Sequence, residues 1–213
     1  MSHIPLFDER SRAFNIRDLI DTGKPRSYTW RCDIHLDQGR SSACTGFAVA
    51  HEAMAYPVPV SHITNVVAKQ IYRRAKQLDQ YPGEAYAGSS VLGAVKAGKE
   101  RGWYTSYYWA FSEMDLRLAV SWKGPAIIGI PWPKDMRKPG KTGIITSIGG
   151  GGTARHAILV KGFNVNSGLY TLHGSYGPLW AHKGDCYLHH THMAQLLRQQ
   201  GECCIPIVRG KGK

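Results

Sequence analysis

The sequence predicts an α+β fold in which a helical lobe precedes a strand-rich, β-barrel-like lobe, with a cleft between them. Apolar residues recur at helical spacing in several segments before residue 124. From Pro125 onward, short β-branched or aromatic runs alternate with Gly, Pro, Asn and Ser. We expect residues 1–29 to form an N-terminal extension, 30–124 the helical lobe and 125–213 the β-rich lobe. A functional site is expected in the cleft between the two lobes.

Helices are expected where a capping residue or a polar loop precedes apolar residues at helical spacing. The first begins at or next to Cys44, where the loop of residues 37–42 gives way to apolar residues at helical intervals. Three more are expected at 62–78 after Ser61, from Ser89 or Ser90 to Gly102, and at 113–122 after Ser112.

The second half of the chain predicts strands joined by turns. Four runs carry the strand pattern: AIIGI at 126–130, HAILVKGF at 156–163, LYTLH at 169–173 and DCYLHH at 185–190. The sequence NVNSG at 164–168 between two of them is typical of a hairpin turn. We expect exposed histidines at 189, 190 and 192, running into a short last helix that Thr191 caps.

Composition points to a basic protein without a membrane segment. The formal net charge is +12, which favours an acidic protein partner or a larger assembly, yet no nucleic-acid-binding motif accompanies it. No apolar run reaches membrane-spanning length, and the N-terminus has no apolar core of the kind that secretory signals carry. The odd set of five cysteines is expected to be reduced. We therefore expect a cytoplasmic protein, with association with a virus particle as an alternative.

Cys44 is the first candidate for chemistry. A helix N-terminus stabilises a thiolate, because its unpaired amides and dipole favour negative charge. The alternative is a small buried hydrophobe, as many free cysteines are. A cysteine nucleophile needs a base and donors for the oxyanion. Gln38, six residues earlier, can send its side-chain amide toward Cys44, and His156 begins a predicted strand that a cleft would bring opposite.

These residues resemble the papain-like cysteine peptidases, in a compact bacterial or phage-like form. The resemblance covers roughly residues 30–188, in the family's order. The matching blocks are DQGRSSACTGFAVA around Cys44, AGSSVLGAVKAGKERGWYTSYYW, GPAIIGI, ARHAILVKGFN around His156, and GSYGPLWAHKGDCYL.

The resemblance implies a thiol hydrolase, a peptidase that cleaves peptide bonds in a peptide or protein substrate. Cys44 attacks, His156 shuttles the proton, and Gln38 with the Cys44 amide holds the oxyanion. Gly88 and Ser89 are candidates for the substrate cleft. Amidase or acyl-transfer chemistry on the same scaffold stays open. We expect no cofactor and no metal. His189, His190 and His192 invite a metal site, but no cysteine or carboxylate stands nearby at ligand spacing.

The sequence departs from the family pattern at the orienting asparagine. That position is Gly174, and Tyr176 stands where the family has a tryptophan that shields the histidine contact. A water or a backbone carbonyl can hold the ring of His156 instead. Without one, we expect weak activity, and we expect Gly174→Asn to raise turnover. A positive φ angle is another reason for a glycine there. His173 and Ser175 are expected to point to the opposite face.

Two further departures concern control and function. The family cysteine three residues before the nucleophile is Ser41, so its usual disulfide is missing. No long inhibitory segment precedes Trp30, so we expect no control by removal of one. The departures also motivate an alternative function: a papain-like domain with little or no activity, used for binding or assembly within a larger particle.

Overall fold

The computed structural model describes residues 3–81 and 83–208 and confirms the α+β class. Short 3₁₀ helices lie at Glu9–Ala13, Ile16–Leu19 and Lys134–Arg137. The α-helices are α1 (Cys44–Met54), α2 (Asn65–Leu78), α3 (Val91–Glu100), α4 (Glu113–Trp122) and α5 (His190–Arg198). The strands are β1 (Tyr28–Thr29), β2 (Tyr104–Trp109), β3 (Ala126–Pro131), β4 (Ile144–Ile145), β5 (Arg155–Asn164), β6 (Leu169–His173), β7 (Asp185–His189) and β8 (Glu202–Val208).

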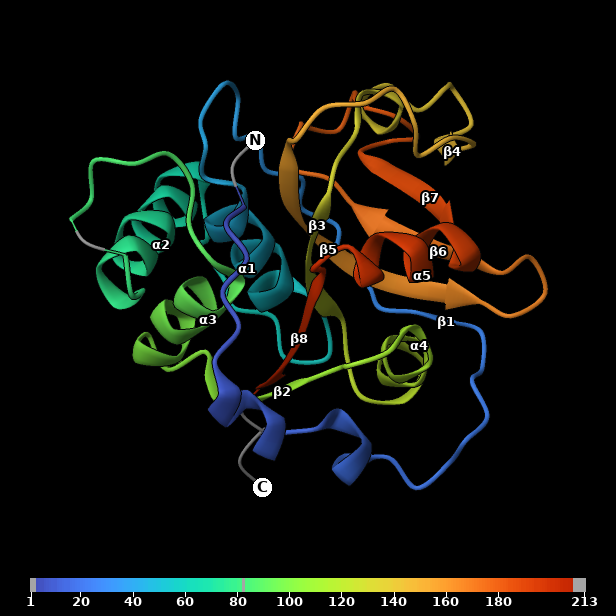
Figure 1. Ribbon diagram of the computed structural model, residues 1–213, viewed down its shortest axis with the longest axis horizontal. Coiled ribbons are helices and arrows are strands. Elements are labelled where there is room, and N and C mark those ends of the chain that lie inside the picture. Colours follow the sequence, from blue (N-terminus) through green and yellow to red (C-terminus); the bar gives the residue numbers. More distant parts are fainter. Residues whose placement is uncertain (1–2, 82, 209–213) are drawn as a thin grey trace.

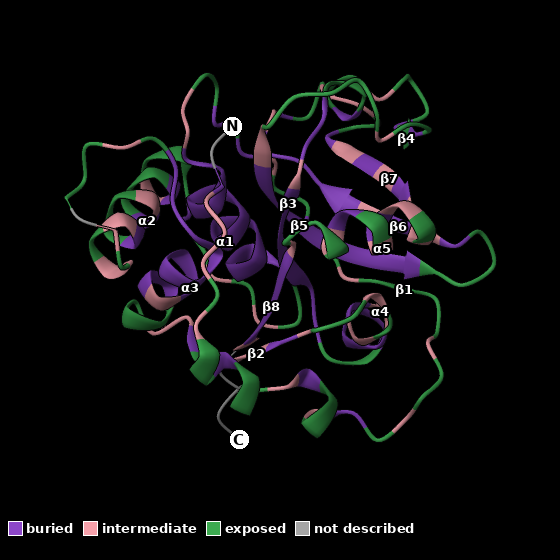
Figure 2. Ribbon diagram, in the orientation of Figure 1, coloured by how far each residue is buried: buried purple, intermediate pink, exposed green. Residues whose placement is uncertain are grey.

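Helix α1 lies at the centre of the molecule, between α2 and α3 on one side and the sheet on the other (Figure 1). Every one of its residues is buried (Figure 2). The reason lies in its sequence, CTGFAVAHEAM, in which small and apolar residues predominate, with His51 and Glu52 as buried polar exceptions. A helix that is apolar all round is stable only when it is enclosed. Its first residue is Cys44, so the prediction of a helix N-terminus there is confirmed.

The strands of the described residues form one sheet in the order β2-β8-β3-β5-β6-β7-β4, with β1 added to β5. Neighbouring strands are antiparallel except for β4 and β7, which are parallel. The predicted hairpin joins β5 to β6, where the Asn164 side chain accepts from the amides of Asn166 and Ser167. Gly168 closes this turn with a φ of 66°.

The central strands β3 and β5 are buried on both faces, which explains their nearly continuous apolar sequences. Residues alternate between two cores because successive side chains of a strand point to opposite faces. Ile127 and Leu159 pack toward α1 and α3. Ile128 and Ile158 pack toward α4 and α5 on the other face. Helices therefore cover both faces of the sheet, and α1 is held directly against β5.

Two expected helix starts differ from the structure. α2 begins at Asn65 rather than at 62, because His62 has a φ of 62° and Thr64 is extended. α5 begins at His190, and His189 rather than Thr191 caps it: its ring accepts from the Thr191 amide. The three histidines at 189, 190 and 192 are half-buried rather than exposed. The caps expected from Ser90 and Ser112 are confirmed.

The division into segments at residues 29 and 124 stays a prediction. Contacts cross both boundaries: β1 at residues 28–29 pairs with β5, and β2 pairs with β8. α4 also packs against the core that contains β3 and β5. Within the described ranges, no helix is both long and apolar enough to cross a membrane.

Candidate active site

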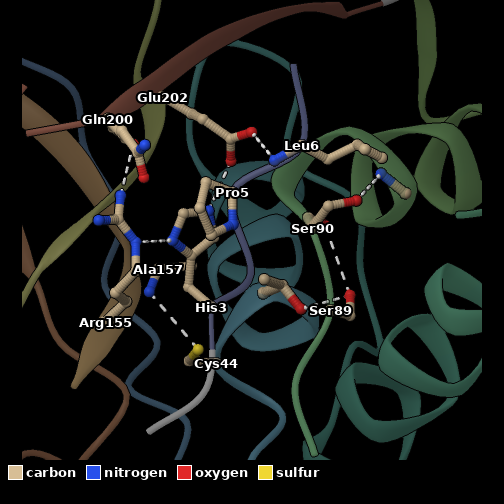
Figure 3. Close-up of polar contacts among 12 residues, drawn as sticks. His3, Pro5, Leu6, Cys44, Ser89, Ser90, Arg155, Ala157, Gln200 and Glu202 are labelled. Atoms are coloured by element: carbon tan, nitrogen blue, oxygen red, sulfur yellow. Dashed lines mark hydrogen bonds and ion pairs between the residues drawn. The ribbon is translucent and has the colours of Figure 1, made fainter. Parts of the chain in front are cut away.

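Cys44 heads α1 and faces strand β5. Its side chain is fully buried, and its Sγ accepts a hydrogen bond from the backbone amide of Ala157 at 3.5 Å (Figure 3). Ala157 directly follows His156 in β5. The contact therefore brings the first residue of α1 to the residue beside the candidate base. An amide donor and a helix N-terminus both favour negative charge on the sulfur.

His156 is held by two aromatic rings and one hydroxyl. Its ring stacks on Tyr176 with 5.3 Å between centroids and lies 5.0 Å from the ring of Trp132. The Tyr176 hydroxyl lies 3.1 Å from Nε2 of His156. Nδ1 of His156 is buried and has no hydrogen-bond partner in the part of the chain that the structure describes. One ring nitrogen is thus bound to Tyr176, and the other is available as a base.

Burial favours the neutral forms of His156 and Tyr176. Burial lowers the pKa of His156 to about 3. Burial, together with the nearby Cys44, raises the pKa of the Tyr176 hydroxyl above its usual range. Cys44 and Tyr176 are therefore close enough for the charge on one group to affect the pKa of the other. In the structure as described, the imidazole is neutral.

Gln38 lies at the start of the loop before α1, and its side chain is fixed at both polar atoms. Its Oε1 accepts from the Ser175 hydroxyl at 2.6 Å, and its Nε2 donates to the carbonyl of Ser41 at 2.8 Å. Its backbone amide also donates to the Ser175 carbonyl at 2.9 Å. One Nε2 hydrogen is engaged by Ser41, which leaves the second for another acceptor.

Gly174 does not have a positive φ, so that explanation for the glycine is wrong. The reason is the indole of Trp180. A Cβ on residue 174 would lie 2.5 Å from Cζ3 and 2.7 Å from Cε3 of that ring. The expectation that a water or a carbonyl holds the His156 ring is replaced by the observed contact with the Tyr176 hydroxyl. Of the residues that flank Gly174, His173 bonds Asp185, whereas Ser175 bonds the side chain of Gln38.

A buried polar cluster lies beneath this region. Nδ1 of His173 bonds Asp185 at 2.7 Å, and Nζ of Lys161 lies 2.7 Å from the same carboxylate. Burial alone would lower the pKa of His173, but its bonds to Asp185 and Cys32 raise it to about 9. Among the described residues, His35, His173 and Asp185 form the group whose donor atoms come close enough for a metal ion. The Lys161 ammonium already pairs with this carboxylate.

The chain's own residues 3–6 lie across the cleft candidates (Figure 3). The amide of Ile4 donates to the carbonyl of Ser89 at 3.0 Å, and the Ser89 hydroxyl lies 3.1 Å from that of Thr45. The amide of His3 donates to the carbonyl of Arg155 at 3.5 Å. Through Ser89, this segment is linked to Thr45, the residue after Cys44. Through the carbonyl of Arg155, it is linked to the residue before His156. Gly88 contacts Tyr72 through its amide at 3.0 Å.

The structure brings Cys44, His156 and Tyr176 together, with Gln38 and Ser175 at the edge of the same region. The contact of the Tyr176 hydroxyl with His156 was not predicted from the sequence. The contacts of His3 with Arg155 and Glu202 were not predicted either. For Tyr176, the one signal in the sequence was its position two residues after Gly174. The contacts of His3 have no local signal, because its partners lie about 150 and 200 residues away.

No protein-family model and no curated protein matches the sequence. Solved structures do. Xylellain, a cysteine protease from Xylella fastidiosa, aligns with a TM-score of 0.70 at 15% identity, over 98% of this chain and 96% of that one. The chain has the papain-like cysteine protease fold. Bromelain from Ananas comosus gives 0.58 at 17% identity, covering 87% of this chain and 100% of that one. Digestive procathepsin L 3 from Tenebrio molitor gives 0.62 at 15%, covering 89% and 72%.

The contact with Trp180 reverses the expected effect of restoring an asparagine. Gly174→Asn must displace the indole, so we expect it to destabilise the fold by about 1–3 kcal/mol and to leave the His156 contacts no better. Urea unfolding measures the change, and Gly124→Asn is the control, because a Cβ at Gly124 meets open space. Equal effects of the two substitutions would contradict the role assigned to Trp180.

Proposed function

We propose that this protein is a thiol hydrolase that cleaves peptide bonds, with Cys44 as nucleophile and His156 as base. The observation that carries the proposal is the bond from the Ala157 amide to the Cys44 sulfur. It places a cysteine at a helix N-terminus against the strand residue that follows a buried histidine. The papain-like fold supports the same chemistry, since the solved structures that align are proteases.

The proposed reaction uses each group in one step. His156 Nδ1 takes the thiol proton of Cys44, and the thiolate attacks the carbonyl carbon of the scissile bond. The second Nε2 hydrogen of Gln38 and the Cys44 amide stabilise the oxyanion. The imidazolium then returns the proton to the leaving amine, which breaks the carbon–nitrogen bond. A water activated by the same imidazole hydrolyses the thioester and releases the acid.

Tyr176 takes the positioning role that the family's asparagine has. The hydroxyl lies 3.1 Å from Nε2 of His156. In the tautomer that carries its proton on Nε2, the hydroxyl accepts from Nε2–H, which leaves Nδ1 as the unprotonated base. Its ring stacks on the imidazole and limits rotation. Ser175 acts in the same way on Gln38, because it holds Oε1 and so fixes the direction of Nε2.

The alternative of a binding or assembly domain has one supporting observation. Cys44 and His156 have no exposed surface, and the backbone of residues 3–4 bonds to Ser89 on one side and to Arg155 on the other. A domain kept for binding needs no access to its sulfur. The high positive charge supports an acidic protein partner for such a domain.

Turnover on a mixed peptide library distinguishes the two functions. We expect cleavage by the wild type, and a fall on the order of 10³-fold or more in Cys44→Ser and His156→Ala, because neither variant can form the thiolate–imidazolium pair. Because residues 3–6 cover the cleft, each variant is also assayed with His3→Ala. Cleavage that survives Cys44→Ser, or no cleavage in any background, would favour the binding domain.

Tyr176→Phe removes the hydroxyl and keeps the stacked ring. We expect kcat to fall on the order of 10-fold with little change in KM, because the imidazole loses alignment while the substrate cleft is unchanged. The pH profile of kcat should shift as well, since Nε2 loses its partner. Tyr28→Phe, at an exposed tyrosine of β1, is the control. An unchanged pH profile and kcat would show that the hydroxyl does not position the ring.

A further inference from the structure

The side chain of His3 is 4% exposed and is enclosed by Gly129, Arg155 and Glu202, which we call the His3 pocket. Its walls come from three strands of the sheet: Gly129 of β3, Arg155 at the start of β5, and Glu202 at the start of β8. Figure 3 shows Arg155 and Glu202 beside the His3 ring. Glu202 is itself 9% exposed, so a carboxylate lies at the base of a nearly closed site. A buried carboxylate is stable only with partners.

The polar groups of the pocket match a neutral imidazole. The Arg155 side chain donates from Nε to Nδ1 of His3 at 3.3 Å. Nδ1 therefore accepts, which leaves the ring proton on Nε2. Nε2 lies 2.5 Å from Oε2 of Glu202 and donates to it. The pocket thus offers one donor and one acceptor, at the separation of the two nitrogens of a histidine ring.

Shape gives a second requirement, for a flat side chain. A Cβ on Gly129 would overlap the His3 ring at Nε2, Cε1 and Cδ2. The glycine therefore leaves room for a ring that lies directly on the backbone of β3. Any larger residue at this position would close the pocket.

Arg155 and Glu202 are held by contacts independent of His3. The Arg155 guanidinium donates to the carbonyls of Gln199 at 3.0 Å and Gln200 at 2.5 Å. The second oxygen of Glu202 accepts from the amide of Leu6 at 2.6 Å. The donor is therefore placed before any ring enters, which lowers the cost of binding, whereas the acceptor is held by Leu6 only while residues 3–6 stay in place.

The pocket adjoins the proposed catalytic groups. Arg155 precedes His156 in β5, and Gly129 pairs with Ala157, whose amide holds Cys44. The backbone of residues 3–4 bonds on one side to Arg155 and on the other to Ser89. A polypeptide that enters along this path would pass Cys44 with one side chain in the pocket.

We propose that this pocket recognises a histidine side chain of a polypeptide substrate, and that residues 3–6 occupy it as an intramolecular competitor. The substrate part rests on the proposed function. A lysine or arginine side chain would bring a second cation against Arg155. An apolar side chain would leave Nε of Arg155 and Oε2 of Glu202 without hydrogen-bond partners. Residues 3–6 and a substrate exclude each other, because they use the same pocket.

The test uses the full chain with His3→Ala, which empties the pocket, and imidazole as the probe. Thermal unfolding is followed at about pH 8, where imidazole is mostly neutral. We expect imidazole to raise the Tm of His3→Ala saturably, with a Kd on the order of millimolar, as suits five heavy atoms. The Tm of the wild type should not respond, because His3 fills the site. Pyrrole and 1-methylimidazole each lack one polar group and should bind ~10-fold more weakly or worse.

Three outcomes would overturn the pocket: no response in His3→Ala, an equal response in the wild type, or equal binding of 1-methylimidazole. Glu202→Met in the His3→Ala background should abolish the response, and the comparison of ligands decides if that variant does not fold.

Cleavage sites in the peptide library should be enriched in histidine at one position. Cleavage without that enrichment overturns the substrate assignment alone. No cleavage overturns the proposed function and the substrate assignment with it, while the imidazole result still decides the pocket.

Discussion

The enclosure of α1 against β5 is the constraint on which the rest of the structure depends. A helix made of small and apolar residues gains stability only by burial on every side, and α2, α3 and the sheet supply those sides. Burial fixes the position of its first residue, Cys44. The antiparallel register of β3 and β5 then places Ala157 opposite Gly129 and next to the sulfur. The site is thus a consequence of how one helix packs on one strand.

A buried network of polar groups fixes the side chains around this contact. The Ser175 hydroxyl holds Gln38, and the Tyr176 hydroxyl holds His156, from two consecutive residues after β6. The end of β6 is itself anchored by His173 through its pair with Asp185. The indole of Trp180 packs on Gly174, which lies between His173 and Ser175 in the chain. The chain has a side-chain partner for the imidazole, but it comes from an aromatic residue instead of an amide.

The fold could be predicted from the sequence because its signals are local and repeated. The α1 pattern after Cys44, the Ser90 and Ser112 caps and the β5–β6 turn each depend on a few neighbouring residues. The contacts of His3 could not be predicted in this way. They join residues nearly 200 positions apart, and no local pattern marks them. The contact of the Tyr176 hydroxyl could not be predicted for another reason. The family has a tryptophan at this position, and a tryptophan has no hydroxyl that would indicate a bond to the histidine.

The central claim is that Cys44 is activated by His156, and alkylation of the five cysteines by iodoacetamide tests it most directly. The protein with His3→Ala is labelled at neutral pH, and the rate at each cysteine is followed by mass spectrometry. The account predicts that Cys44 reacts ~10-fold faster than Cys32, Cys186, Cys203 and Cys204 or more, and that His156→Ala removes the difference. A Cys44 that reacts no faster than Cys32, with or without His156, would contradict it.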